Sequence, residues 1–157
     1  MKNKDFLYHL IATFFFSGKS PKAPGTMGSL ATLPLVALVY PLGTPTLLIA
    51  TVLSYLIGIW AVQKILATST NKDPGFVVID ETAGQLTTFL FIAPVTSLSI
   101  INLILGFALF RLFDIVKIWP CSYFDKKVVG AFGVMTDDIF AGIYAGTVLL
   151  LINQFIF

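Results

Sequence analysis

Long stretches without a charged residue divide this chain and predict its helices. Residues 23–63 carry no charge and are interrupted near the middle by Pro41-Leu42-Gly43-Thr44-Pro45. Proline and glycine at that point favour a turn between two apolar segments. The pattern therefore predicts a helical hairpin, with one arm at 29–40 and the other at 46–63.

A second charge-free stretch, residues 82–110, is broken by Pro94-Val95-Thr96-Ser97. It is expected to cross a membrane once, turn, and return through residues 98–118, although its first arm is short for a full bilayer. The last stretch, 139–157, is long enough to span. The pattern predicts five crossings, preceded by an amphipathic helix at the N-terminus.

Composition identifies the class of protein. The 157 residues are 57% hydrophobic and only 11% charged, with a mean hydropathy of +0.91, which is too apolar for an ordinary soluble domain. We expect an all-α, polytopic membrane helical bundle forming a single domain over residues 1–157. The single cysteine excludes an intrachain disulfide and a metal site built on paired thiolates.

Charge distribution predicts the orientation of the bundle. If both proline-containing breaks lie on one side, most of the lysines lie on the other, and the positive-inside rule makes that other side cytoplasmic. The acids at the ends of the predicted spans fall on the same side, so the chemistry should face the cytoplasm. The lysines counted are Lys2, Lys4, Lys19, Lys22, Lys64, Lys72, Lys126 and Lys127.

Two adjacent acids, Asp80 and Glu81, interrupt an otherwise apolar run. An ionised carboxylate in a water-poor environment is costly unless a cation, a metal or several hydrogen bonds compensate it. The pair therefore indicates a charged ligand.

Arg111, Asp114 and Lys117 recur at three-residue spacing and form one stripe on a predicted helix. A charged stripe on an apolar helix must face the bundle. It has two interpretations of similar weight, an ion-pair ladder that fixes helix packing and a set of functional groups. Arg111 is the only arginine, and its planar fork suits a phosphate.

A third group contains Asp137 and Asp138. Asp138 shares a stripe of four-residue spacing with Gly142 and Gly146, which predicts that it points at a neighbouring helix. The alternative is that one acid simply caps the last span. The sequence leaves open whether the same small-residue face also supports a homo-oligomer.

The turn from Ser20 to Ser29 leads directly into the first predicted span. Backbone N–H groups at a helix start, with Ser29 or Thr26 as the cap, would make a phosphate-binding nest. A helix cap within an ordinary surface turn is the alternative. The candidate substrate-binding residues in this turn are Lys22, Gly25, Thr26, Gly28 and Ser29.

The acids and bases converge on one side of the predicted bundle. Oxygen ligands without histidine or cysteine favour Mg²⁺, which binds through a few carboxylates and substrate phosphates. Other hydrolase chemistries lack their residues: His9, the sole histidine, is far in sequence from the acids, and Lys127 stands where a Cys-x5-Arg loop needs arginine. No basic stripe with interleaved aromatics indicates nucleic-acid binding.

Four linked motifs carry a family resemblance across nearly the whole chain. They are Ser20-Pro21-Lys22-Ala23-Pro24-Gly25-Thr26 with Gly28-Ser29, Ile79-Asp80-Glu81 with Gly84-Gln85, Phe110-Arg111-Leu112-Phe113-Asp114 with Lys117, and Gly133-Val134-Met135-Thr136-Asp137-Asp138 with Ala141-Gly142. Together they resemble phosphatidylglycerophosphatase A. The resemblance implies magnesium-dependent hydrolysis of the terminal phosphate of phosphatidylglycerophosphate, giving phosphatidylglycerol, at the cytoplasmic face of the bacterial inner membrane.

The sequence departs from the family pattern at Met27, where tryptophan is common, at Ile118, where proline is usual, and at Ala131, which replaces one glycine of a pair. None of these departures removes an acid or a base. They leave the implied reaction intact and weaken expectations about loop geometry.

Roles for the candidate residues follow as hypotheses. The leading magnesium ligands are Asp80, Glu81, Asp137 and Asp138, one of which accepts the proton of the attacking water. Asp114 either joins them or orients Arg111. Arg111, Lys117 and Lys22 would neutralise phosphate oxygens, and the turn at 25–29 would supply N–H donors.

Two other classes of function are weighed against the phosphatase. A small cation- or proton-coupled transporter would also use acids within the membrane, but here they lie near span ends instead of the midplane. A purely structural membrane protein would pair its charges, and this chain has more acids than such pairs use.

Overall fold

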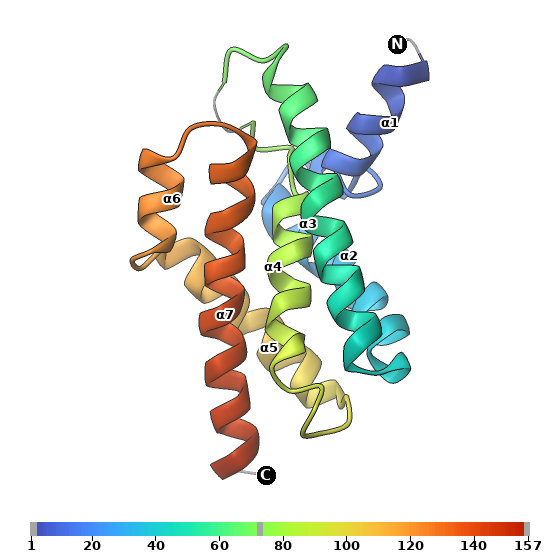
Figure 1. Cartoon of the computed structure of the whole chain (residues 1–157), viewed down its shortest axis with the longest axis vertical. Helices are drawn as coiled ribbons and strands as arrows, with labels where there is room; N and C mark the ends of the chain where they lie inside the picture. Colours follow the sequence, from blue (N-terminus) through green and yellow to red (C-terminus); the bar gives the residue numbers. More distant parts are fainter. Residues whose placement is uncertain (1–2, 72–73, 156–157) are drawn as a thin grey trace.

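The protein is all-helical throughout residues 3–71 and 74–155, the part of the chain that the computed structural model describes (Figure 1). This confirms the predicted fold class for those residues. The α-helices are α1 (Asn3–Ala12), α2 (Pro24–Val39), α3 (Thr44–Leu66), α4 (Ile79–Leu90), α5 (Ile100–Val116), α6 (Cys121–Lys127) and α7 (Ala131–Phe155), with short 3₁₀ helices at η1 (Ser17–Lys19) and η2 (Tyr40–Leu42).

The first predicted hairpin is confirmed by α2 and α3, which flank the proline-containing break. α2 begins five residues earlier than the predicted arm because Pro24 occupies its first turn, a position where proline's missing N–H costs nothing. η2 and Gly43, which has a φ of 92°, make the turn into α3. α5 falls within the predicted segment 98–118.

Three helical segments are long and apolar enough to cross a membrane, and they are Pro24–Leu42, Thr44–Leu66 and Ala131–Phe155. α4 has 12 residues and α5 has 17, so they are shorter than these three. The described residues thus bear out the membrane class and not the count of five spans. Large apolar side chains such as Ile49 and Ile104 are about 60% exposed on α3 and α5, as expected of surfaces that contact lipid.

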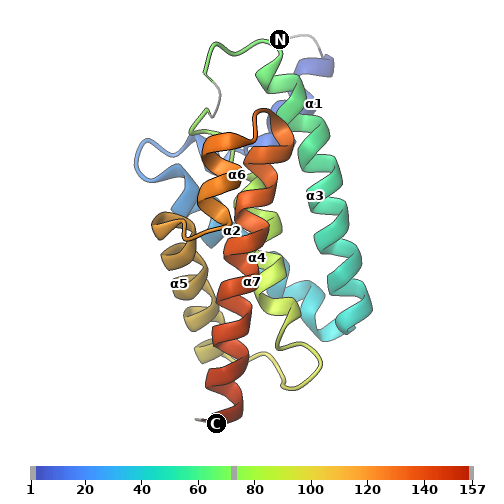
Figure 2. The ribbon, with the colours of Figure 1, turned by 60° about the vertical axis from the view of Figure 1, so that its left-hand side comes forward.

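α4 is the central helix, surrounded by α2, α3, α5 and α7 (Figures 1 and 2). It is buried on nearly every side although it carries several polar residues. Two of its threonines find hydrogen-bond partners within the helix. The hydroxyls of Thr87 and Thr88 donate to the carbonyls of Ala83 and Gly84 at 2.8 and 3.2 Å. The hydroxyls of these two threonines are thus satisfied within α4, whereas both amide atoms of the fully buried Gln85 have no hydrogen-bond partner among the described residues.

Small residues bring α4 and α7 into close contact. A Cβ placed on Gly142 would overlap the carbonyl oxygen of Gly84 and lie 2.9 Å from the Cβ of Thr87. A Cβ on Gly146 would lie 2.8 Å from the carbonyl oxygen of Thr88. The predicted contact of this stripe with a neighbouring helix is confirmed, and that helix is α4 of the same chain.

The connections of the bundle lie at opposite ends. The α2–α3 turn and the α4–α5 loop share the lower end in Figure 1, while the α6–α7 connection and the end of α3 lie at the upper one. The two breaks therefore share one end, which is the condition on which the predicted orientation depends. Met1, Lys2, Lys72, Asp73, Ile156 and Phe157 lie outside the described residues.

A helix of 10 residues, α1, begins the described part of the chain. α1 ends at Ala12, and the backbone then turns through Phe14, Phe15 and Phe16, which have φ values of 39, 54 and 68°. These left-handed residues end the helix and return the chain toward α2. Ala12 and Thr13 are fully buried, so the end of α1 packs into the bundle.

Candidate active site

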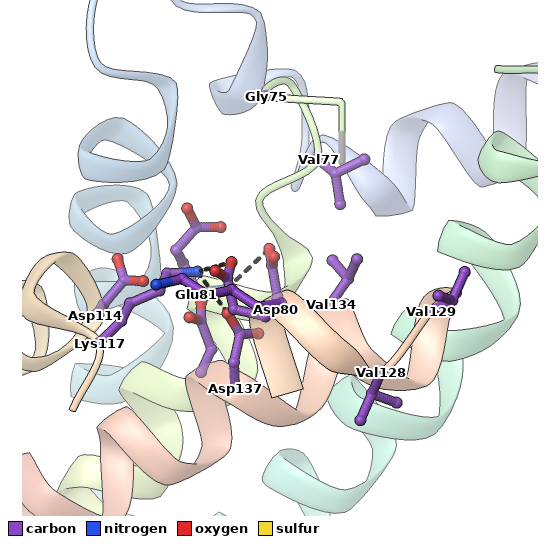
Figure 3. A pocket seen from close by; sticks show the side chains of 14 residues that line it. Gly75, Val77, Asp80, Glu81, Asp114, Lys117, Val128, Val129, Val134 and Asp137 are labelled. Carbon is purple, nitrogen blue, oxygen red and sulfur yellow. Dashed lines mark hydrogen bonds and ion pairs between the residues drawn. The ribbon is translucent and has the colours of Figure 1, made fainter. Parts of the chain in front are cut away.

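A cavity of about 180 Å³ opens beside the first turns of α4 and α7 (Figure 3), and its lining also includes residues from the end of α5, from α6 and from the segments that precede α4 and α7. It gathers most of the acids of the chain. Its polar and charged lining consists of Asp80, Glu81, Asp114, Lys117, Asp125, Lys126, Asp137 and Asp138.

Three carboxylates from two helices meet in this cavity. Asp80 and Glu81 occupy the first turn of α4, and Asp138 comes from the second turn of α7. One oxygen of each lies within 4.8 Å of the others. Asp80 is 9% exposed and Asp138 is 3% exposed. We refer to these three residues as the carboxylate triad.

Asp137 is adjacent to Asp138 in sequence but faces a different partner. Consecutive residues of an α-helix point about 100° apart, and the Asp137 carboxylate accepts a bond from the Lys117 ammonium group at 2.6 Å. Its other oxygen, Oδ1, is buried and has no partner among the described residues. The interpretation of these acids as a helix cap is wrong, because α7 begins six residues earlier at Ala131.

Lys117 ends α5 in a left-handed conformation, with a φ of 47°. Its Nζ bridges Asp137 at 2.6 Å and Asp125 at 2.7 Å. Burial alone would lower the pKa of Lys117, but the two carboxylates outweigh it and raise the pKa above its usual value. Lys117 therefore stays protonated.

Asp125 is a site residue that the sequence analysis missed. It lies on α6 and tethers that short helix to Lys117. The available signal was weak, since a lone acid beside Lys126 and Lys127 is typical of a solvated surface.

Arg111 is surrounded by groups from three helices. Its guanidinium lies 2.6 Å from Asp114, one turn along α5, and 3.7 Å from Glu81 of α4. It also donates to the hydroxyl of Ser29 on α2 at 3.3 Å. The predicted charged stripe therefore does face the bundle, but its third member, Lys117, pairs with Asp137 and Asp125 instead.

The start of α2 differs from the predicted nest. The residue before the helix is Ala23, with a φ of 45° and no side-chain cap, so neither Ser29 nor Thr26 is the cap. Ser29 donates instead to the carbonyl of Gly25 at 3.0 Å.

Two glycines let α2 approach the site. A Cβ on Gly25 would overlap the Glu81 carboxylate and lie 3.3 Å from the Arg111 guanidinium, and one on Gly28 would overlap Val78. Lys22 is exposed in the preceding turn, where its carbonyl accepts a bond from Ser20.

Negative charge predominates in the cavity. Burial raises the pKa of Glu81 to about 8, with the charges of Asp138 and Asp114 adding to the increase and Arg111 opposing it. The Oε2 atom of Glu81 is buried and has no partner among the described residues. A cation held between the carboxylate oxygens would reduce the repulsion among these acids and would give Oε2 of Glu81 a partner.

Cys121, at the start of α6, is expected to react slowly with thiol reagents. It is 1% exposed, and burial raises the pKa of its thiol to about 11, so little thiolate exists near neutral pH. Iodoacetamide labelling followed by mass spectrometry should show the native protein largely unmodified and the denatured protein fully modified. Rapid labelling of the native protein would contradict the burial of this residue.

Comparisons with known proteins show which family the chain is similar to. The sequence model of the family described as phosphatidylglycerophosphatase A matches residues 10–153. Phosphatidylglycerophosphatase A of Haemophilus influenzae is 44% identical over 146 residues, covering 92% of this chain and 88% of the relative. Phosphatidylglycerophosphatase A of Escherichia coli is 35% identical over 147 residues, covering 94% of this chain and 84% of the relative. No solved structure matches the chain significantly.

Proposed function

The chain belongs to the phosphatidylglycerophosphatase A family, and we propose that the cavity at the starts of α4 and α7 is where it removes the terminal phosphate of phosphatidylglycerophosphate. The protein is a lipid phosphatase. The observation that carries the proposal is the carboxylate triad, which lies in a cavity that also contains Lys117. Such an arrangement suits phosphate hydrolysis assisted by a metal ion.

The triad fits Mg²⁺. All of its donors are carboxylate oxygens, the ligand type that magnesium prefers. The unpartnered Oε2 of Glu81 is a buried acceptor for which a cation would supply the missing interaction. Asp80, Glu81 and Asp138 would hold the ion, whereas Asp137, a fourth ligand in the sequence analysis, is engaged by Lys117. Bound Mg²⁺ would activate water and stabilise charge on the phosphate oxygens.

The protein's own residues supply the remaining steps. A water oxygen forms the new bond to phosphorus while the bond from phosphorus to the glycerol oxygen breaks, and the departing oxygen takes up the proton that the water has given to a carboxylate. Asp137 lines this cavity, and its unpartnered Oδ1 is the candidate acceptor for the proton of the attacking water. Lys117, held protonated by two carboxylates, neutralises phosphate oxygens.

Arg111 acts from the α2 side of the triad. Its short ion pair with Asp114 favours the interpretation that Asp114 orients Arg111 and does not bind the metal. The first turn of α2 adds the N–H groups of Gly25 and Thr26, which have no intrahelical acceptor. Lys22, exposed in the turn before α2, stays a prediction for phosphate contact.

Several apolar helices support membrane association. We propose that the chain lies in the bacterial inner membrane with the cavity toward the cytoplasm, because most lysines of the sequence fall in segments that connect the helices on the side opposite the two proline-containing breaks.

Removing divalent metal is expected to stop the reaction. Phosphate release from phosphatidylglycerophosphate in detergent should fall by about a hundredfold or more after treatment with a chelator, and added Mg²⁺ should restore it. Chelator saturated with Mg²⁺ beforehand serves as the control. Full activity after exhaustive chelation would refute the magnesium assignment, and absence of phosphate release at every metal concentration would refute the activity itself.

A further inference from the structure

A second cavity, of about 480 Å³, lies beside the candidate active site. Its wall is mostly apolar and backbone surface, and its polar side chains are those of Lys19, His9 and Ser20. Gly75 lines this cavity and the catalytic one, so the two adjoin. The residues that line the second cavity are His9, Gly18, Lys19, Ser20, Pro24, Gly75 and Phe76.

A thin partition separates the two cavities. Pro24, the first residue of α2, faces the second cavity, and the next residue, Gly25, packs against Glu81 and Arg111. Phe76 lines the second cavity while its neighbour Val77 lines the catalytic one. Figure 3 shows Gly75 and Val77 on the non-helical segment that leads into α4, where Asp80 and Glu81 lie. A flexible ligand that passes Gly75 could therefore occupy both cavities.

Lys19 differs from Lys117 of the catalytic cavity in having no acid beside it. Lys117 is paired with Asp137 at 2.6 Å and with Asp125 at 2.7 Å, whereas the described residues that line the second cavity include no carboxylate. Lys19 is exposed, and its ammonium group lies 4.7 Å from the centre of the Phe16 ring. Among the described side chains, no carboxylate forms an ion pair with it. Its charge is therefore available to an anion.

The substrate carries a second anionic group, a phosphodiester, and the carboxylates of the catalytic cavity would repel it. Phosphatidylglycerophosphate has a terminal phosphomonoester and, across one glycerol, a phosphodiester. The catalytic cavity is lined by six carboxylates and two lysines, so a second phosphate there would be repelled unless each charge were compensated. A phosphodiester is better placed in the second cavity, where Lys19 lies among described lining residues that include no carboxylate.

We infer that the second cavity binds the phosphodiester of the substrate headgroup, with Lys19 as its cationic partner. This inference rests on the proposed function, because it takes the terminal phosphate to lie at the carboxylate triad. The site would hold the headgroup across the partition and distinguish a lipid with two phosphates from one with a single phosphomonoester. Lys19 is then a specificity residue that does not touch the reacting atoms.

Product inhibition tests the inference because each of the two products should bind in a different cavity. Phosphatidylglycerol retains the diester, whereas inorganic phosphate derives from the terminal group. Lys19→Gln is expected to raise the KM for phosphatidylglycerophosphate and the inhibition constant of soluble dihexanoyl phosphatidylglycerol about tenfold each, the loss of one charge-assisted hydrogen bond. The inhibition constant of phosphate and kcat should stay within about twofold of wild type.

Two further variants exclude simpler explanations. Lys19→Arg keeps the charge and should restore inhibition by dihexanoyl phosphatidylglycerol. Lys64→Gln removes an exposed lysine near the end of α3 that lines neither cavity, and it should leave both inhibition constants unchanged.

The inference is overturned if Lys19→Gln weakens both inhibitors equally, if it weakens neither, or if Lys64→Gln has the same effect as Lys19→Gln. Failure of the proposed function gives a different result, since the wild-type protein would then release no phosphate from the lipid at all.

Discussion

Replacing Asp138 with asparagine is expected to lower the rate of phosphate release by about 10²–10³-fold, the usual effect of removing one strong electrostatic contact from a reaction centre. Asparagine has nearly the same shape as aspartate, so a residue that is 3% exposed keeps its packing. What is lost is one of three carboxylates that lie within 4.8 Å of one another. Asp80→Asn should behave similarly, because Asp80 belongs to the same triad.

The concentration of Mg²⁺ at half-maximal activity provides the second readout for these variants. It should rise in Asp80→Asn and Asp138→Asn, since fewer charges hold the ion. Asp125→Asn is the matched comparison: Asp125 lines the same cavity but contacts Lys117 and lies outside the triad. That variant should lose about tenfold or less in rate, with an unchanged dependence on Mg²⁺. Wild-type rates in folded Asp80→Asn and Asp138→Asn proteins would exclude the triad as the metal site.

Gly142→Ala is expected to destabilise the bundle by about 1–3 kcal/mol, as overpacking of a tight contact does. In a helix interior, alanine is normally favoured over glycine by about 1 kcal/mol. At this position the added methyl group meets the carbonyl oxygen of Gly84 and the Cβ of Thr87. Because one obstacle is helix backbone, α4 and α7 must separate to make room. The sign of the change is therefore opposite to the propensity.

Thermal unfolding of the detergent-solubilised protein should show this as a melting temperature several degrees below wild type. Activity should fall too, since the triad takes Asp80 and Glu81 from α4 and Asp138 from α7. Gly75→Ala is the control for stability, because nothing lies within 4 Å of a Cβ at that position. A melting temperature equal to or above wild type in Gly142→Ala would contradict the close contact of α4 and α7.

The sequence was informative about elements whose signals are local. The break at Pro41–Pro45 and the break at Pro94–Ser97 both separate helices in the structure. Helix boundaries were less certain where competing signals existed. Asp137 and Asp138 resembled an N-terminal cap, yet α7 begins at Ala131. Ser29 resembled a cap as well, and in the structure it bonds back within α2.

The count of spans could not be settled from apolar length alone. The segment after Asp80 is charge-free for many residues, but the helix within it, α4, has only 12 residues and is enclosed by other helices. An apolar run looks the same in the sequence whether it contacts lipid or protein, because burial by neighbouring helices depends on contacts distant along the chain.

The sequence by itself determined the helical class, the membrane character and the set of acids and bases, because apolar length, proline breaks and the cost of charge in an apolar run depend on neighbouring residues. The tertiary structure alone decided how that set divides. It joined Asp138 to Asp80 and Glu81, turned Asp137 toward Lys117, and brought in Asp125 from α6. Adjacent residues on a helix point in different directions, and only the packing of α4, α5, α6 and α7 determines what each one meets.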